Sequence, residues 1–356
     1  MRIETVSFND LGPTEISRWR EIQRFNGELI NPSFCPEFTA AIASVRTDVE
    51  IAVLEEDNRL VGFFPFQRKT KNTAYPVGSL ISDMNGVIIE DGVQWNAEEL
   101  LRACALECWH FDHLIAEQRP FGAYHQAQDV SGFMDLSQGY QTYLESRHLA
   151  GTSIIRDGLR KARKAERELG PLRLEWNNPD RAMLGTFLEW KQKHIARQGF
   201  YDVYREDWVV SAIGRVLECQ GADFAGFVST LHAGDELLAI VLGMQGNNVA
   251  SSWLPTYNPA YQRFSPGLIQ HLEIAKQAAE LGIIRIDLGR GENRMKSGLM
   301  SDFQAVAIGS VELRALHRFR NSAWFGLRAV AHSDLMKGWP LQSARRAKNF
   351  LVSLKS

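Results

Sequence analysis

The sequence predicts an α/β protein in which two similar halves each hold a mixed central sheet flanked by helices. Three observations lead to this prediction: the 356 residues are enough for two ordinary domains, strand-like and helix-like runs alternate, and the same order of elements occurs twice. We expect a first half over residues 1–149, a second half over 150–313, and a basic helical extension over 314–356.

Composition and charge are those of a globular protein, with 45% hydrophobic and 23% charged residues. No apolar run reaches the roughly 18 residues that a membrane-spanning helix needs. The start of the chain, Met1-Arg2-Ile3-Glu4, lacks the apolar core of a signal peptide, and we therefore expect a cytoplasmic protein. The four cysteines are scattered and have no histidine cluster beside them, so we expect neither a disulfide framework nor a metal site.

The first half alternates strands and helices. The pattern predicts strands over 2–8, 50–55, 60–67, 86–90 and 113–117, and helices over 14–26, 36–45 and 96–109. Pro65 indicates a bulge or an edge position at the end of the third of these runs.

The second half begins near residues 149–152 with a basic helix, predicted over 153–169 and ended by Gly170-Pro171. Its basic residues are spaced three or four apart and so share one face: Arg156, Arg160, Arg163, Lys164 and Arg167. That face either is solvated or binds an anionic partner. Next come a strand over 172–176, helices over 181–197 and 207–219, and a strand over 223–231, with Tyr201 in an aromatic corner between the helices.

The most informative stretch is 237–296. Two strands, 237–245 and 249–254, flank the hairpin turn Gly246-Asn247-Asn248, and a helix (268–281) and another strand (283–288) follow. Between hairpin and helix stands Gln262-x-x-Ser265-x-Gly267. We expect Ser265 to cap the helix, Pro266 to take its first position and Gly267 to let an anion approach the free N–H groups there. By itself this pattern also fits an ordinary capped helix.

The order hairpin, turn, helix and strand resembles the acetyl-CoA-binding core of the GCN5-related N-acetyltransferase (GNAT) superfamily. Its phosphate turn has the form Arg/Gln-x-x-Gly-x-Gly/Ala; Gln262 and Gly267 match this form, and Ser265 replaces the first glycine. The flanking segments Tyr257-x-Pro-x-Tyr261, Asp287-Leu-Gly-Arg-Gly291 and Met295-Lys296 are similar to the CelD-like (BioF2-like) acetyltransferase family, over about residues 19–313. That family has an aromatic residue where this chain has Met295.

The resemblance implies tandem GNAT-like domains and an acyl-CoA-dependent N-acyltransferase. It further implies that acetyl-CoA or another acyl-CoA is the co-substrate, without a metal. The acceptor would be an amino sugar or a sugar-lipid intermediate of bacterial exopolysaccharide biosynthesis, and no nucleic acid is expected as a partner. In such enzymes a backbone N–H of the strand before the turn, here near 253–256, polarises the thioester carbonyl.

The resemblance also assigns site residues. Those expected to bind the cofactor are Trp253, Leu254, Gln262, Arg263, Ser265, Pro266 and Gly267. Asp287 and Glu292 are the candidates for the general base, and Tyr257 lines the thioester or protonates the leaving thiolate. Alternatively, Asp287 only pairs with Arg285 or Arg290. The residues expected to contact the acceptor or another anionic group are Asp83, Arg160, Tyr201, Arg290, Arg294 and Lys296.

The first half has two carboxylates, Glu90 and Asp91, where its own phosphate turn would stand. They would repel a diphosphate, so we expect no cofactor there. We expect this half to form one wall of the acceptor groove, with 75–78 and 82–85 as lining; the alternative is that these are plain surface turns.

From Arg314 onward the chain has nine basic residues and one acidic residue, Asp334. This basic tail permits peripheral contact with the inner face of a membrane, and the alternative is that it is an exposed terminal helix. Two alternatives to the leading function stay open. One is a Fem-type transferase that takes its acyl group from aminoacyl-tRNA; the other is a non-catalytic regulatory module whose tail binds a membrane or a cyclic dinucleotide.

Overall fold

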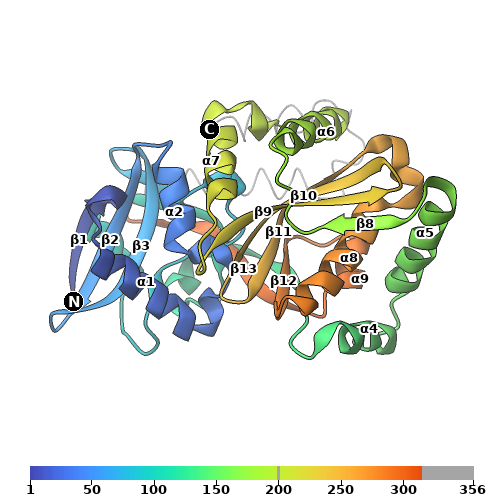
Figure 1. Ribbon diagram of the computed structural model, residues 1–356. Coiled ribbons are helices and arrows are strands. Elements are labelled where there is room, and N and C mark those ends of the chain that lie inside the picture. The colour runs from blue at the N-terminus through green and yellow to red at the C-terminus, as the bar shows by residue number, and fades with distance from the viewer. Residues whose placement is uncertain (199–200, 315–356) are drawn as a thin grey trace, which may run out of the picture.

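The computed structural model describes residues 1–198 and 201–314, whose strands join into one mixed sheet (Figure 1). In chain order they are β1 (Arg2–Ser7), β2 (Val49–Glu56), β3 (Arg59–Thr70), β4 (Thr73–Tyr75), β5 (Ile88–Ile89), β6 (Cys108–Ile115), β7 (His125–Asp135), β8 (Leu172–Glu175), β9 (Ala225–Ala233), β10 (Glu236–Gly246), β11 (Val249–Tyr257), β12 (Arg285–Arg290) and β13 (Asp302–Glu312). Across the sheet their order is β1-β2-β3-β4-β6-β13-β7-β12-β11-β10-β9-β8, and β5 pairs with β3 beside this path. The predicted mixed α/β class is confirmed, but the two expected sheets form one.

Helices cover both faces of this sheet. They are α1 (Pro13–Phe25), α2 (Pro36–Ala43), α3 (Ala97–Ala103), α4 (Gly139–Leu149), α5 (Ile154–Leu169), α6 (Ala182–Gln198), α7 (Asp207–Glu218), α8 (Pro266–Glu280) and α9 (Arg294–Leu299). One hydrophobic core takes residues from α1, α2, α6 and α7 and so spans both halves. Another lies under α4, α5 and α8, which gather on the opposite face of the second half (Figure 1).

The last described strand, β13, lies inside the first half. It pairs antiparallel with β6 on one side and with β7 on the other. In turn β7 pairs with β12, so that Ile286 lies opposite Met134. The two halves therefore interlock, and residues 291–301, which connect β12 to β13, run from the second half into the first.

Two features of the first half differ from what the sequence predicts. The helix predicted over 96–109 ends at Ala103, because Ala105 has a left-handed backbone (φ +52°) and β6 starts at Cys108. The strand β7 was not predicted, because its sequence is largely polar and has little alternation. Its strand conformation depends on pairing with β12 and β13, which are distant in sequence.

The parallel strands β11 and β12 separate after a short contact. Val249–Ser251 pair with Arg285–Asp287, and beyond that point β11 continues along β10 while β12 follows β7. A bulge lies at the divergence, where Ser252 and Trp253 lie opposite the single residue Gly243. The Asn258 N–H donates to the Leu238 carbonyl (2.9 Å), so the backbone of Asn258 faces β10. Because backbone groups alternate in direction along a strand, every second residue between the bulge and Asn258 points its N–H and C=O away from β10.

The close approach of α7 to β9 gives a testable stability prediction. A Cβ on Gly226 would lie 2.2 Å from the Val216 carbonyl oxygen and 2.7 Å from the Leu217 Cα. We expect Gly226→Ala to lower the free energy of unfolding by about 1–3 kcal/mol, because backbone atoms cannot move aside as a side chain can. Gly214→Ala, in open space on the same helix, is the control and should stabilise by roughly 0.5–1 kcal/mol. Equal changes in the free energy of unfolding of the two variants, measured by urea denaturation, would contradict this prediction.

Candidate functional site

The turn before α8 is built by a strained residue. The 3₁₀ turn Pro259–Phe264 ends at Ser265, which has a left-handed backbone (φ +52°), and Pro266 starts the helix as predicted. The prediction that the Ser265 side chain caps α8 is wrong, since its hydroxyl accepts a hydrogen bond from the Lys161 ammonium instead. A Cβ on Gly267 would have no atom within 4 Å. The first turn of α8 is therefore open to a ligand.

A cavity of about 730 Å³ opens at this turn. It is lined by Ile154, Asp157, Arg160, Lys161, His194, Pro255, Thr256, Tyr257, Gln262, Ser265, Pro266, Gly267, Leu268, His271, Asn293, Arg294 and Met295. These residues come from α5, α6, the end of β11, the start of α8 and the start of α9, which surround the point where β11 and β12 separate.

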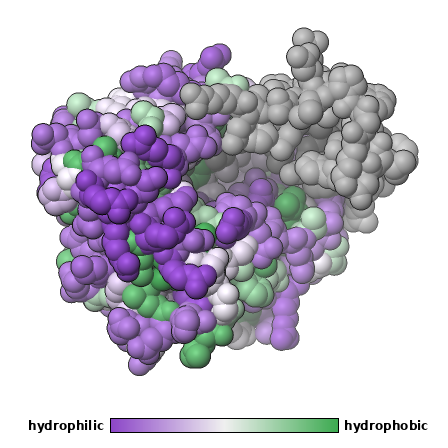
Figure 2. Space-filling model, turned by 90° about the vertical axis from the view of Figure 1, so that its right-hand side faces the viewer, coloured by the Kyte–Doolittle hydropathy of each residue, from purple (hydrophilic) through white to green (hydrophobic). Residues whose placement is uncertain are grey.

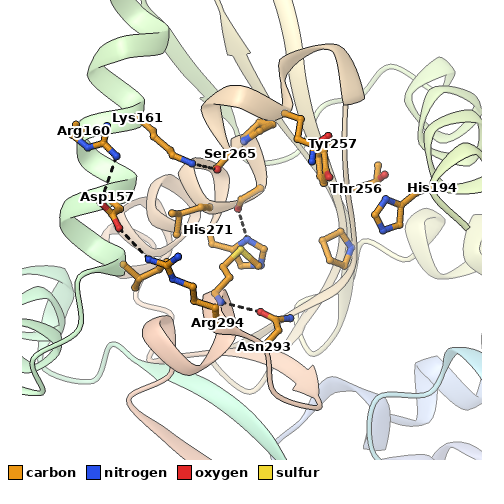
Figure 3. A pocket seen from close by; sticks show the side chains of 17 residues that line it. Asp157, Arg160, Lys161, His194, Thr256, Tyr257, Ser265, His271, Asn293 and Arg294 are labelled. Atoms are coloured by element: carbon orange, nitrogen blue, oxygen red, sulfur yellow. Dashed lines mark hydrogen bonds and ion pairs between the residues drawn. The ribbon is translucent and has the colours of Figure 1, made fainter. Parts of the chain in front are cut away.

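Three cationic side chains line the cavity: Arg160, Lys161 and Arg294. Asp157 is the acidic residue of the lining, and it lies 3.5 Å from the Arg160 guanidinium and 3.8 Å from that of Arg294. Figure 3 shows Arg160 and Lys161 on one side of the cavity, His194 on the other and His271 between them. Basic groups beside a helix N-terminus favour a phosphate-bearing ligand.

His271 forms the floor of the cavity and is held in one neutral form. Its Nδ1 donates to the Gly267 carbonyl (2.6 Å), which leaves Nε2 to accept from the Ser252 hydroxyl (3.0 Å). Burial lowers the pKa of this imidazole further below its usual range. His271 therefore adds no charge to the cavity but ties the start of α8 to the bulge of β11.

The open edge of β11 already has one side-chain partner. Lys191 of α6 donates a hydrogen bond from Nζ to the Pro255 carbonyl (2.9 Å), which faces away from β10. Pro255 has no N–H to offer there. By this alternation the backbone N–H groups on the open side are those of Trp253, in the bulge, and of Tyr257, which lies one residue beyond the range 253–256 predicted to polarise a carbonyl.

The candidate catalytic residues lie in three different settings. Asp287 is fully buried beside the divergence, and its two carboxylate oxygens accept hydrogen bonds from Asn31 (2.6 Å) and Arg285 (2.6 Å). The hydrogen bond from Arg285 is the pairing that the sequence analysis gave as the alternative to a catalytic role for Asp287. Asp287 does not line the cavity. Glu292 is exposed. Tyr257 lines the cavity, and its ring meets that of His194 edge-on at 6.1 Å.

The residues predicted to bind the cofactor divide in two groups. Gln262, Ser265, Pro266 and Gly267 line the cavity. The other three do not: Trp253 and Leu254 pack in the core shared by the two halves, where the Trp253 indole N–H donates to the Ile81 carbonyl (2.5 Å), and Arg263 forms an ion pair with Glu168 (3.3 Å).

The residues predicted to contact the acceptor are also divided. Arg160 and Arg294 line the cavity. Tyr201 lies in a separate pocket, where its hydroxyl donates to Glu206, and Arg290 bonds to the Asp112 carbonyl and lies 3.7 Å from Asp129.

Asp83 and Lys296 both lie beside Gly289 where the two halves join, and neither lines the cavity. The Asp83 carboxylate accepts a hydrogen bond from Ser251, the last residue of β11 that pairs with β12. Burial raises the pKa of Asp83 to about 6, although Ser251 and the nearby His113 and Lys296 oppose the rise. Burial also lowers the pKa of Lys296, and Asp83 opposes that effect. Carboxyl and amine groups with pKa values shifted toward each other are typical of functional sites.

Sequence reasoning missed Lys161, Lys191 and His194. Lys161 follows Arg160 on α5, but it was not among the basic residues predicted to share a face of this helix. Most of the basic residues that were predicted to share that face are exposed, on a largely hydrophilic surface (Figure 2). Lys191 and His194 lie one turn apart on α6, so their spacing predicts that they share a face of the helix. The spacing does not predict which part of the molecule that face contacts.

Comparison with known proteins agrees with this geometry. Residues 154–297, which contain the cavity, match the family described as acetyltransferase (GNAT) domain. The crystal structure of FemX superposes with a TM-score of 0.55 at 12% identity, covering 90% of this chain and 99% of that one. A conserved protein of unknown function from Bacteroides thetaiotaomicron VPI-5482 gives 0.52 at 12% identity, covering 87% and 98%. No curated protein matches the chain in sequence.

The chain therefore carries a GNAT acyltransferase domain and is an enzyme of the N-acyltransferase type. FemX shares the fold of nearly the whole chain. None of the helices within 1–198 and 201–314 is long and apolar enough to cross a bilayer. The basic tail and the contacts expected of it lie outside the described residues, apart from Arg314, which pairs with Glu107 (2.5 Å).

Proposed function

We propose that this enzyme transfers an acyl group, most simply acetyl, from acyl-CoA to the amine of an amino sugar or a sugar-lipid intermediate of bacterial exopolysaccharide biosynthesis. The observation that carries the donor assignment is the cavity at the N-terminus of α8, which has basic side chains on its rim and open space at Gly267. The acceptor class rests on the resemblance to the CelD-like family and on the amine that the reaction requires.

The described residues fit a CoA donor. The N-terminal turn of α8, with Lys161, Arg160 and Arg294 nearby, suits phosphate groups. The open edge of β11 offers backbone groups to the amide-containing arm, and the N–H of Trp253 or Tyr257 is placed to polarise a carbonyl. When bound, the thioester supplies the activated acyl group.

Asp83 is our candidate for the general base. It comes from the first half, bonds to Ser251 beside the divergence of β11 and β12, and retains partial exposure to solvent. With a pKa of about 6 it is ionised at neutral pH and can take a proton from an attacking ammonium or amine. Asp287, in contrast, has both oxygens engaged by Asn31 and Arg285. Tyr257, on the cavity wall, is placed to protonate the leaving thiolate.

The first half supplies the acceptor wall in this proposal and binds no cofactor. Glu90, after β5, is paired with Arg18 and Arg59 (2.7 Å), and Asp91 accepts a hydrogen bond from Asn26 (2.9 Å). In this proposal these carboxylates stand where the first half would carry its own phosphate turn, and they engage the guanidinium groups of Arg18 and Arg59, which are therefore not available to an anion.

A Fem-type donor, aminoacyl-tRNA, is the second candidate, because FemX shares the fold. Many Fem-type enzymes have a coiled-coil helical arm inserted between their halves, and the described residues hold no such arm. There the connection holds α4 and α5, which pack on α8. We therefore favour acyl-CoA.

An acyl-transfer assay tests the proposal. The purified protein is incubated with acetyl-CoA and a panel of amino sugars, while release of free thiol is followed and the product is identified by mass. We expect thiol release that depends on the amine, together with an acetylated product. Acceptor-independent hydrolysis alone, or turnover only with aminoacyl-tRNA, would contradict the proposal.

A further inference from the structure

Gly289 leaves a gap between two charged side chains, one from each half of the chain. A Cβ on Gly289 would lie 3.6 Å from Asp83 Oδ1 and 3.8 Å from Lys296 Nζ. Its own chain neighbours aside, no other atom of the described residues comes within 4 Å of that point. All three residues are half-buried, so the gap is reached from solvent. We call it the Gly289 gap.

Each charged group keeps one hydrogen-bonding position for a ligand in this gap. The Ser251 hydroxyl donates to Asp83 Oδ2, which leaves Oδ1 as the oxygen that faces Gly289. Lys296 Nζ donates to the carbonyls of Gly289 (3.2 Å) and Arg290 (3.0 Å), and an ammonium group has three N–H donors. A ligand in the Gly289 gap therefore meets one anionic acceptor and one cationic donor.

The gap adjoins the donor cavity on the side of α9. Asn293 caps this helix, because its side-chain oxygen accepts from the backbone N–H groups of Met295 and Lys296 (3.0 Å each). Asn293 and Met295 line the cavity. The backbone of Lys296 is thus fixed by a residue of the cavity wall, and its side chain extends from that wall to the gap.

The gap also adjoins the cavity on the side of β11. Ser251, which holds Asp83, is followed by Ser252, whose hydroxyl donates to His271 on the cavity floor (3.0 Å). Burial is the main cause that lowers the pKa of His271, and the charge of Lys296 adds to it, as expected for groups that lie near each other. An acceptor in the gap would therefore lie next to the bound donor.

We propose that Gly289 determines acceptor specificity, because the gap beside it takes a primary amine together with a hydroxyl group on the neighbouring carbon. The amine donates to Asp83 Oδ1, and the hydroxyl oxygen accepts from the third N–H of Lys296. The inference deepens the proposed function and rests on it, since Asp83 is the group that takes the amine's proton. It narrows the acceptor to amino sugars whose amine has a free hydroxyl beside it; an isolated amine would leave the ammonium without an acceptor.

Gly291 provides a control for the backbone role of Gly289. Both glycines have a left-handed backbone, with φ of +72° and +88°, so an alanine at either position is strained to a similar extent. A Cβ on Gly291 would meet no atom within 4 Å, whereas one on Gly289 would fill the gap. We expect both alanine variants to lose similar stability, and only Gly289→Ala to change acceptor binding.

Binding of small amines in the absence of any donor tests the gap. The probes are trans-2-aminocyclohexanol and cyclohexylamine, which lacks the hydroxyl group, and their Kd values are measured by NMR titration at neutral pH. We expect the wild type to bind the amino alcohol about tenfold more tightly, because one charge-assisted hydrogen bond is added. Lys296→Met should remove this preference. Gly289→Ala should lose the binding and Gly291→Ala should keep it, with circular dichroism showing that both stay folded.

Equal Kd values of the two amines for the wild type, or no binding of either, would overturn the proposal. Unchanged binding in Gly289→Ala would overturn it as well. Acetyl transfer from acetyl-CoA judges the proposed function separately. A preference for the amino alcohol in a protein that transfers no acetyl group would uphold the gap and reject that function, whereas equal transfer to glucosamine by Gly289→Ala and the wild type would uphold the function and reject the gap.

Discussion

Asp83→Asn is expected to lower kcat of acyl transfer by about 10²–10⁴-fold, because the amide cannot accept the proton that the attacking amine must lose. Asparagine has the same shape and can still bond to Ser251, so the fold and the affinity for acetyl-CoA should be unchanged. Steady-state kinetics with saturating donor measures the effect, and calorimetric affinity for acetyl-CoA is its control.

The pH profile and two other carboxylates separate Asp83 from its rivals. Since the pKa of Asp83 is raised to about 6, Asp83 becomes protonated and is lost as a base when the pH falls through 6, and kcat/KM should fall about tenfold per pH unit below it.

Glu292→Gln, at an exposed position, should leave turnover unchanged. Asp287→Asn should mainly lower stability, because it leaves the Arg285 guanidinium without its counter-charge. Full turnover in Asp83→Asn would assign the base elsewhere.

Gly267→Asp is expected to abolish binding of acyl-CoA in a protein that stays folded. The new carboxylate would project into the open space at the start of α8 and repel phosphate groups, whereas an acidic residue in the first turn of a helix does not destabilise it. In the wild type, acetyl-CoA at about 100 times its Kd should stabilise the native state by about 2.7 kcal/mol, which raises Tm. In the variant the ligand should not shift Tm.

Gly267→Ala is the matched control for this substitution. The added methyl group meets no atom within 4 Å, so the alanine variant should fold as well as the wild type and still respond to acetyl-CoA. An equal rise of Tm in the aspartate variant would remove the α8 turn as the phosphate site.

Local signals in the sequence predicted the second half well. The hairpin at Asn247-Asn248, the proline at the first position of α8 and the end of α5 at Gly170 depend on residues close in the chain, and the structure has all three. The cavity is formed largely by the stretch that these signals identified. For that reason Gln262, Ser265 and Gly267, which the sequence predicts to lie together, all line this cavity.

Features that depend on distant pairing could not be predicted in the same way. Nothing in the sequence of β13 indicates that it inserts between β6 and β7, because any alternating strand would fit the edge of either half. Asp287 lies beside the divergence of β11 and β12, and its partner Asn31 is 256 residues away in the chain, so this pairing could not be predicted from local sequence. Lys191 reaches the Pro255 carbonyl only because α6 lies against the open edge of β11.

Calorimetric titration of the wild-type chain with acetyl-CoA tests the central claim most directly. We predict saturable binding of one equivalent per chain, because the α8 turn of the second half is open while the corresponding position of the first half holds Glu90 and Asp91. Absence of binding at millimolar acetyl-CoA would contradict the claim that this cavity takes the donor, and two equivalents would contradict the assignment of the first half.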